Sequence, residues 1–457
     1  MSKRVSKRKG LRISTMEGSW ATLHAVLTSG GIFTAYVLFL GANDFQLALL
    51  SAMPLLAQVI QIPGAWLVER TGKRRLIVGW FSVVSRTFWL PIALIPLFTR
   101  DHGIRLFVAL YLASSIVMNF SGAGWVAWMS ALVPNRIRGR YFATRNNIIG
   151  LVTIVSSLAG GFVIDAFRDH GHAYGGFLTV MAVAVFGGLM AFRMILQQPD
   201  PEYRPEAIPP LLRYLFRPLA DTNYRRIVLF YLYWLFAVNL ASPFFNAHLL
   251  KYMHWNQKTL ALFGVISSVS AILSQRGWGH LLDRYGNKPV LMITAIGIIH
   301  LPLYYVFCPW TVSWPMYANA LFTGLFWAGF GLASFTQLID VLPSSQRTMY
   351  VALMGALSGV TNFISMILGG WLAHRLDGVH WQFGSLQVIN YQVLFVITTL
   401  LRIPALLLLR RIREPDAQGT AFVMRKMLTA MNRRIGLGRL ISPVPARDNV
   451  ADFPRQP

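Results

Sequence analysis

Cysteine and acidic residues are the scarcest features of this sequence of 457 residues. Its one cysteine, Cys308, excludes an intrachain disulfide and with it the small secreted domains that such bridges stabilise. Charged residues make up only 13% of the chain, whereas hydrophobic residues make up 55%. Long uncharged runs recur throughout, which is typical of a protein that crosses a membrane many times.

Catalytic motifs are also absent. The sequence has no H-E-x-x-H, no G-x-S-x-G and no pair of acids in the middle of an apolar run. His170, His172, His374 and His380 have spacings that a metal could tolerate, but no cysteine accompanies them. We therefore expect no enzymatic activity, no cofactor and no metal site; an integral-membrane enzyme acting on lipids is the weaker alternative.

The apolar runs predict an all-α integral membrane protein, because each is near the ~20 residues that a helix needs to cross a bilayer. They are too long for barrel strands and do not alternate in polarity. The twelve predicted spans cover residues 19–41, 45–68, 76–98, 104–131, 141–166, 174–196, 226–250, 258–282, 289–308, 314–341, 347–374 and 387–410.

The spans form two groups of six, which suggests two bundles. We predict a basic N-terminal tail (1–18), a first bundle (19–196), a linker (197–225), a second bundle (226–410) and a basic C-terminal tail (411–457), partly disordered. The linker opens with prolines and continues with leucines at helical spacing, between which lie Arg213 and Arg217. The C-terminal tail repeats this amphipathic pattern with Met424, Leu428 and Met431. Both stretches predict helices that bind anionic lipid, with a cytoplasmic partner protein as the alternative.

The formal net charge of +25 has two explanations. Nucleic-acid binding is disfavoured because the basic residues are dispersed among loops between apolar spans. Most of them lie in the tails and in the loops on the same side as the N-terminus, and basic loops remain in the cytoplasm. The sequence thus predicts a multi-pass protein of the cell inner (plasma) membrane with both termini cytoplasmic.

The chain also repeats itself, which predicts that the two bundles are pseudo-symmetric. One set of pairs is separated by 209 positions (343 − 134 = 209): Pro134 and Pro343, Arg138 and Arg347, Tyr141 and Tyr350, and the glycine pairs at 160–161 and 369–370. A second set is separated by 214 positions (284 − 70 = 214): Arg70 and Arg284, Gly72 and Gly286, and Arg86 and His300.

Two short basic loops carry the most specific signal. Residues 278–289 read W-G-H-L-L-D-R-Y-G-N-K-P, and residues 64–75 read G-A-W-L-V-E-R-T-G-K-R-R, each between two apolar spans. These loops resemble the signature loop of the major facilitator superfamily, in a bacterial-type transporter, and the likeness extends over about residues 19–410. The motif residues are Glu69, Arg70, Gly72 and Arg74 in the first copy and Gly279, Asp283, Arg284, Gly286 and Lys288 in the second.

The resemblance implies a role for these loops. Asp283 is expected to face the start of a helix in the opposite half, with Arg284 and Lys288 completing a charge network that holds the inner gate shut. The first copy departs from the pattern, because Glu69 replaces aspartate and its first glycine falls at position 64. The alternative is that these loops are solvated turns without a role in gating.

Polar side chains within the spans are candidates for solute binding or for hydrogen bonds between helices. The resemblance implies that the first, fourth, seventh and tenth spans line a central cavity. The predicted substrate-binding residues are His24, Arg86, Asn119, Asn239, Asn246 and Gln337, and possible proton-coupling residues are His24, His300 and Asp340. Asp44, Asp165 and the motif acids fall near span ends, so we expect no acid at mid-depth.

Many proton-coupled members of the superfamily use such a buried acid, so a neutral or anionic solute fits better than a cationic drug. The sequence therefore predicts a secondary active (symporter or antiporter) or facilitative transporter that moves a small solute by alternating access, in a rocker-switch motion. Its expected partners are that solute and anionic lipids of the cytoplasmic leaflet, with the protein as a monomer. A non-transporting receptor or assembly protein is the alternative.

Overall fold

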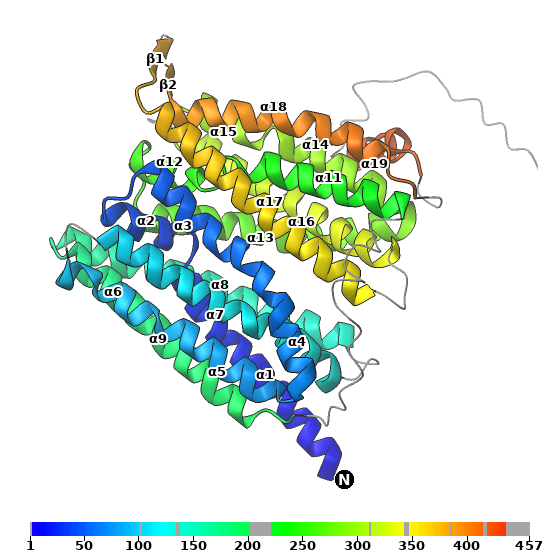
Figure 1. The fold of residues 1–457 in the computed structure, drawn as a ribbon. Coiled ribbons are helices and arrows are strands. Elements are labelled where there is room, and N and C mark those ends of the chain that lie inside the picture. Colours follow the sequence, from blue (N-terminus) through cyan, green and yellow to red (C-terminus); the bar gives the residue numbers. More distant parts are fainter. Residues whose placement is uncertain are drawn as a thin grey trace, which may run out of the picture.

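The computed structural model describes residues 2–99, 103–133, 138–200, 221–309, 312–341, 347–383, 386–414 and 418–435. The helix predicted in the linker and the end of the C-terminal tail lie outside the described residues. Almost all described residues are helical, and they form two bundles that we call the N-lobe and the C-lobe (Figure 1).

The N-lobe holds the first six spans. Its helices are α1 (Ser2–Leu27), α2 (Gly30–Phe39), α3 (Asp44–Leu56), η1 (Ala57–Ile60), α4 (Gln61–Thr71), α5 (Arg74–Thr87), α6 (Trp89–Phe98), α7 (Gly103–Leu132), α8 (Arg138–Asp169) and α9 (Ala173–Gln197).

The C-lobe holds the other six spans and the described part of the tail. Its elements are α11 (Thr222–Asn239), α12 (Phe244–Lys251), α13 (Gln257–Tyr285), α14 (Asn287–Ile299), α15 (Leu301–Phe307), α16 (Trp314–Val341), α17 (Arg347–Arg375), β1 (His380–Phe383), β2 (Leu386–Ile389), α18 (Asn390–Arg410) and α19 (Thr420–Ile435).

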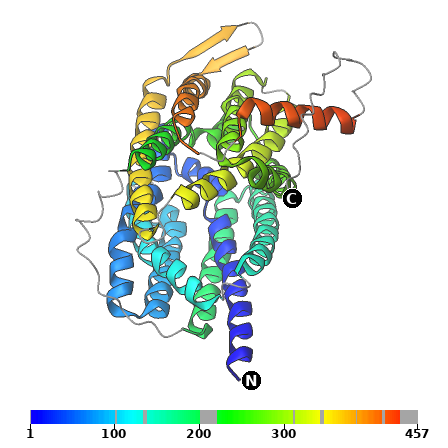
Figure 2. The same ribbon diagram turned by 90° about the vertical axis from the view of Figure 1, so that its right-hand side faces the viewer.

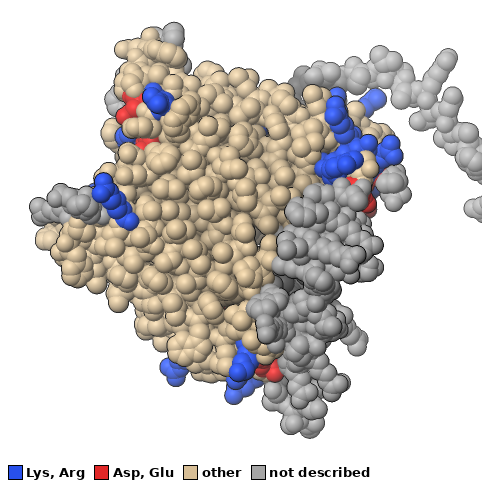
Figure 3. Space-filling view, viewed as in Figure 1, with Lys and Arg blue, Asp and Glu red and all other residues tan. Residues whose placement is uncertain are grey.

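Twelve segments of the described chain are long and apolar enough to cross a membrane, as predicted. Large apolar side chains face outward along them: Leu151 is 64% exposed, Leu273 75% and Leu400 59%. Figure 3 shows a broad uncharged band with Lys, Arg, Asp and Glu confined to its two ends. Lipid tails would cover such a band, so the exposed leucines are not misplaced core residues.

Several spans are broken, and the breaks recur in both lobes. In the first span the chain turns at Gly30, whose φ of +59° is in the left-handed region that glycine tolerates. The seventh span breaks at the corresponding place, between Asn239 and Phe244, where Pro243 cannot continue a helix. The third and ninth spans also break at equivalent points, near Phe88 and His300. These matching breaks agree with the predicted internal repeat.

The first span begins earlier than residue 19. The helix α1 starts at Ser2, and the apolar segment runs from Lys9 to Phe39. Glu17 is consequently eight residues inside the span (17 − 9 = 8), or about 12 Å along the helix. The sequence analysis placed Glu17 before the first span and expected no acid at mid-depth, so it missed this acid.

The two faces of the bundle differ. We call the face with the N-terminus and α19 the terminal side, and the opposite face, with the β1–β2 hairpin, the hairpin side (Figure 1). The hairpin pairs His380 with Ile389 and Trp381 with Val388 in antiparallel register, and the sequence analysis did not foresee these strands. On the terminal side, α19 lies crosswise to the C-lobe helices (Figure 2). It is docked by buried Val423 and by Phe422, whose ring lies 6.5 Å from that of Tyr285.

The lobes meet on the hairpin side. The main contacts join α3 to α17, α8 to α13 and α2 to α12. Small residues allow the backbones to approach: a Cβ on Gly161 would lie 2.9 Å from the Gln257 carbonyl oxygen, and one on Gly370 only 2.4 Å from the Ala48 Cβ. The glycine pairs of the predicted repeat thus sit at two equivalent seams between the lobes. Toward the terminal side, the second span continues as α4, which packs on α7 of its own lobe.

Candidate functional site

A cavity of about 350 Å³ lies between the lobes, bordered by α1, α2, α8, α12 and α13. Among the described residues, its lining has no charged side chain; the polar ones are Ser29, Thr153, Ser157, Asn246, Gln257, Ser267 and Ser268. A Cβ on Gly30 or on Gly264 would meet no atom within 4 Å, so these two lining glycines leave the space open. Since both lobes supply walls, a movement of one lobe against the other would change the cavity.

Of the six predicted substrate-binding residues, only Asn246 lines this cavity. Asn239, Asn119 and Gln337 instead bond within their own lobes. Asn239 Nδ2 donates to Asn362 Oδ1 at 2.9 Å, and Asn119 Oδ1 accepts from Gln61 Nε2 at 3.0 Å.

Gln337 is 1% exposed, and its Oε1 accepts from the Tyr231 hydroxyl at 3.1 Å. Hydrogen bonds between neighbouring helices therefore hold these three residues in this conformation, although Gln337 Nε2 has no partner among the described residues.

His24 and Arg86 lie inside the N-lobe rather than on the cavity. The Nδ1 atom of His24 is 2.9 Å from the Ala184 carbonyl oxygen, and the His24 ring makes an edge contact with Trp89. Arg86 is 5% exposed. A Cβ on Gly188 would lie 2.9 Å from the Cβ of Arg86, so the glycine makes room for the arginine side chain. The structure thus buries both residues among α1, α5 and α9.

Arg86 belongs to a buried charge cluster that the sequence analysis missed. We define this N-lobe charge cluster as Glu17, Arg86 and Arg145, from α1, α5 and α8. Glu17 Oε2 is 3.8 Å from Arg145 Nη2, and the Arg145 guanidinium lies 5.0 Å from the centre of the Trp125 ring.

The cluster is incompletely satisfied. Among the described residues, Glu17 Oε2, Arg86 Nη1 and Arg145 Nε have no hydrogen-bond partner. Two arginines and one glutamate leave one formal positive charge in a buried site, which is costly unless it is paired or functional. Gly18 was the available signal: a Cβ there would lie 2.4 Å from Arg145 Nη2, so glycine creates the space for the guanidinium.

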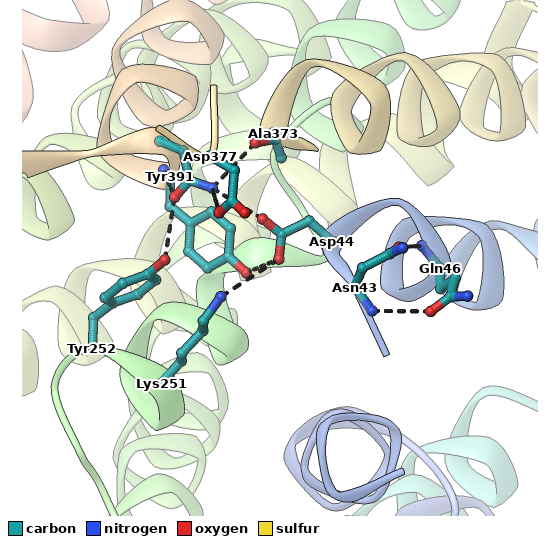
Figure 4. A network of polar contacts seen from close by, with 9 residues as sticks. Asn43, Asp44, Gln46, Lys251, Tyr252, Ala373, Asp377 and Tyr391 are labelled. Atoms are coloured by element: carbon teal, nitrogen blue, oxygen red, sulfur yellow. Dashed lines mark hydrogen bonds and ion pairs between the residues drawn. The ribbon is translucent and has the colours of Figure 1, made fainter. Parts of the chain in front are cut away.

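A second unpredicted site closes the hairpin side of the seam. Asp44, at the start of α3, is 6% exposed and points into the C-lobe (Figure 4). Its carboxylate accepts hydrogen bonds from the Tyr391 hydroxyl and from Asn390 Nδ2, the latter at 3.0 Å, and lies 4.0 Å from Lys251 Nζ. One N-lobe acid thus binds three C-lobe groups.

Asp165, also in the N-lobe, binds the C-lobe at the seam between α8 and α13. Its two carboxylate oxygens accept from the backbone N–H groups of Gln257 and Lys258, at 3.1 and 2.8 Å. These N–H groups are at the N-terminus of α13, where a helix favours negative charge. Asp44 and Asp165 together form what we call the carboxylate clamp. Both acids were placed near span ends by the sequence analysis, but their partners in the other lobe were not predicted.

The two signature loops share their turn geometry. Gly72 has φ +66° and Gly286 has φ +88°, so each helix ends in a left-handed glycine. The side chains of Glu69, Arg70 and Arg74 lie outside the described residues. Gly64 allows close packing, because a Cβ on it would lie 2.9 Å from the Phe120 backbone, whereas the space beside Gly279 is open.

In the second copy, Asp283 and Arg284 are exposed. Among the described residues no hydrogen bond or ion pair is found for Asp283, so the predicted network across the lobes stays a prediction. Lys288 is bound within the C-lobe, since its Nζ donates to the carbonyls of Arg410 and Ile412. Glu414, which was not predicted, accepts from the Asn287 and Lys288 N–H groups, each at 2.8 Å.

The candidate proton-coupling residue His300 is not among the residues that line the cavity. His300 lies at the break between α14 and α15, among the rings of Tyr304, Phe322 and Phe326. The side chain of Asp340 lies outside the described residues.

The described part of the chain thus has twelve segments that are long and apolar enough to cross a membrane, in two equivalent lobes. A cavity lies between the lobes and polar contacts close one side, which is the architecture of two-lobed membrane transporters. A model of the Major Facilitator Superfamily matches residues 19–339 and 227–444, so the chain belongs to that family. The predicted resemblance and the predicted fold are confirmed.

Known proteins agree with this assignment. The tetracycline resistance protein, class H, of Pasteurella multocida is 28% identical over 141 residues, which is 31% of this chain and 33% of that protein. The match thus spans only a third of that relative. Among solved structures, the xylose transporter XylE from E. coli in its inward-open conformation has a TM-score of 0.67 at 16% identity, over 92% of this chain and 99% of that one. A variant of the nucleoside transporter NupG has a TM-score of 0.66 at 12% identity, over 88% and 100% of the two chains. These likenesses show the fold alone.

Proposed function

We propose that this protein carries a small, neutral or anionic solute across the inner membrane by alternating access. The observation that carries the proposal is the cavity between the lobes together with the carboxylate clamp, which joins the lobes on the hairpin side. Breaking the clamp would let one lobe pivot and expose the cavity to the opposite side.

The orientation follows from the basic residues. Lys73, Arg284 and Arg411 are on loops or helix ends of the terminal side, which we assign to the cytoplasm by the excess of positive charge. In this orientation the clamp closes the extracytoplasmic face, so the conformation is inward-facing. The signature loops are then apart, and the Asp283 network would form when the lobes close on the cytoplasmic face.

For energy coupling we propose Glu17 rather than His24, His300 or Asp340. The buried Glu17 carboxylate pairs with Arg145 and is attracted by the charge of Arg86. It can exist with or without a proton, and the gain or loss of that proton changes the net charge of the N-lobe charge cluster. His24 is committed to the Ala184 carbonyl, and His300 lies among aromatic rings and does not line the cavity. Protonation of Glu17 would therefore be the event that changes how α1, α5 and α8 pack.

The test is uptake by the purified protein in reconstituted vesicles, with a broad solute panel and with or without a pH gradient. Movement of at least one solute well above protein-free vesicles supports a carrier. The receptor alternative is separated by removing the residues after Glu414: a carrier keeps most of its uptake without them, whereas an assembly protein that acts through its tail loses its function.

A further inference from the structure

We propose that the cavity between the lobes binds a neutral solute rich in hydroxyl groups, of the size of a monosaccharide or a nucleoside. This inference rests on the proposed transport function and narrows its substrate class, because it excludes the anionic solutes that the function alone allows.

The charge of the lining is the first argument. None of the described residues that line the cavity is acidic or basic. An ionised solute that leaves water needs a partner of opposite charge, because the desolvation of an unpaired ion is costly. The N-lobe charge cluster does not supply one, since Glu17, Arg86 and Arg145 are all absent from the lining.

The second argument concerns the positive end of α13. This helix begins at Gln257, on the cavity wall, and a helix N-terminus is an anion site in many proteins. Here Asp165 already occupies that position and accepts from the N–H groups of Gln257 and Lys258. An anionic solute would have to compete with a carboxylate of the protein itself, so the one feature that would favour an anion is neutralised.

The third argument is the set of polar groups left for a solute. Gln257 is 2% exposed, and its Nε2 has no hydrogen-bond partner among the described residues. Among the described residues, no hydrogen-bond partner is found for the side chains of Ser29, Ser157, Asn246 and Ser267 either. Hydroxyls and amides both donate and accept, so they match the mixed donors and acceptors of a polyol. They would be left unsatisfied by an apolar solute, which disfavours a lipophilic drug.

Size gives the remaining limit. A volume of about 350 Å³ is at the lower end of the range, ~300–1,000 Å³, in which small-molecule sites fall. Apolar groups of Val26, Ile32 and Phe263 complete the wall and suit the C–H surface of a sugar ring.

The experiment compares compounds of one shape and different charge. The full-length protein in vesicles is given radiolabelled glucose, glucuronate and glucosamine, and in parallel uridine and uridine monophosphate. We expect a neutral member of one series to enter, and its charged relatives to compete poorly even at tenfold excess. Loss of one buried hydrogen bond in Gln257→Leu should raise the half-saturation concentration about tenfold, and Ser157→Ala should raise it by a smaller factor. The control Gln275→Leu is on the same helix about 27 Å from Gln257 and should stay within twofold of the parent.

The outcomes separate the two proposals. Preferred uptake of glucuronate, glucosamine or uridine monophosphate overturns the neutral class but leaves the carrier function standing. Uptake of a neutral compound that neither Gln257→Leu nor Ser157→Ala alters also overturns this inference, since the solute then binds outside the cavity. It too leaves the carrier function standing. Uptake of none of these compounds, by protein shown to be inserted and folded, counts against the substrate class; if a broad panel also fails, the carrier function falls with it.

Discussion

Asp44→Asn is expected to shift the protein toward its outward-facing conformation. The substitution keeps the shape of the side chain but removes its charge, and it turns one acceptor oxygen into an amide donor that faces Asn390, Lys251 or Tyr391. Because Asp44 is only 6% exposed, water cannot easily replace the lost bond. All three contacts cross the seam, so they stabilise only the conformation in which the hairpin side is closed.

The magnitude can be worked from these contacts. A hydrogen bond to a charged group contributes about 1.5–3 kcal/mol, so the loss of one shifts the equilibrium between the two conformations by about 30-fold for ~2 kcal/mol. The Lys251 contact contributes much less, since the side chain is 44% exposed and the ion pair is 4.0 Å long. Lys251→Met should therefore change the equilibrium by less than about fivefold.

The assay measures access to the seam from outside. With Cys308→Ser as background, Ser51→Cys places a thiol on the face of α3 that also carries Asp44 and Ala48, at helical spacing. The rate at which a membrane-impermeant maleimide labels it reports the outward-facing fraction. Asp221→Asn is the matched control, because the Asp221 carboxylate also accepts two hydrogen bonds, at 2.7 and 2.9 Å, but within one lobe. A labelling rate in Asp44→Asn equal to or below that of the parent would refute the role of the clamp.

Three further outcomes are expected. Asp283→Asn should slow transport at least tenfold without preventing membrane insertion, because the exposed carboxylate would act only in the conformation closed on the terminal side; unchanged uptake in vesicles would contradict this. Glu17→Gln should abolish accumulation driven by a pH gradient but spare exchange of solute across the membrane, and an intact gradient response would exclude Glu17 as the coupling acid. Arg425→Gln with Lys426→Gln, in a peptide of residues 418–435, should weaken binding to phosphatidylserine vesicles about 30-fold, at ~1 kcal/mol for each charge; equal binding would show that α19 does not use its charges on lipid.

The fold could be predicted because a bilayer imposes a strong and simple pattern. A long apolar run has to be a helix, and the repeats at 209 and 214 positions identify two halves without any knowledge of packing. The start of the first span was misplaced because Glu17 and the basic residues before it lower the local hydropathy. The burial of Glu17 depends on Arg86 and Arg145, which are distant from it in the sequence.

The site could be predicted less well, because polarity within a span does not say what a side chain faces. Asn239 and Asn246 are on the same helical stretch at i and i+7, yet the break at Pro243 separates them, and only Asn246 reaches the cavity. The clamp was not foreseen for a related reason. Acids at span ends are ordinary, and only the pairing of the lobes gives Asp44 its partner Tyr391, which lies 347 positions away in the sequence (391 − 44 = 347).

The clamp also bears on how the duplicated halves recognise each other. The helices α3 and α13 start at equivalent places, after the N-cap residues Asn43 and Asn256, so the C-lobe carries the neutral Gln257 where the N-lobe carries Asp44. At the position equivalent to Asp165 the C-lobe carries His374 (165 + 209 = 374). Two copies of the N-lobe placed face to face would bring carboxylate against carboxylate, and two C-lobes would lack both carboxylates. The clamp therefore favours the pairing of the two different halves of one chain over the pairing of two like halves.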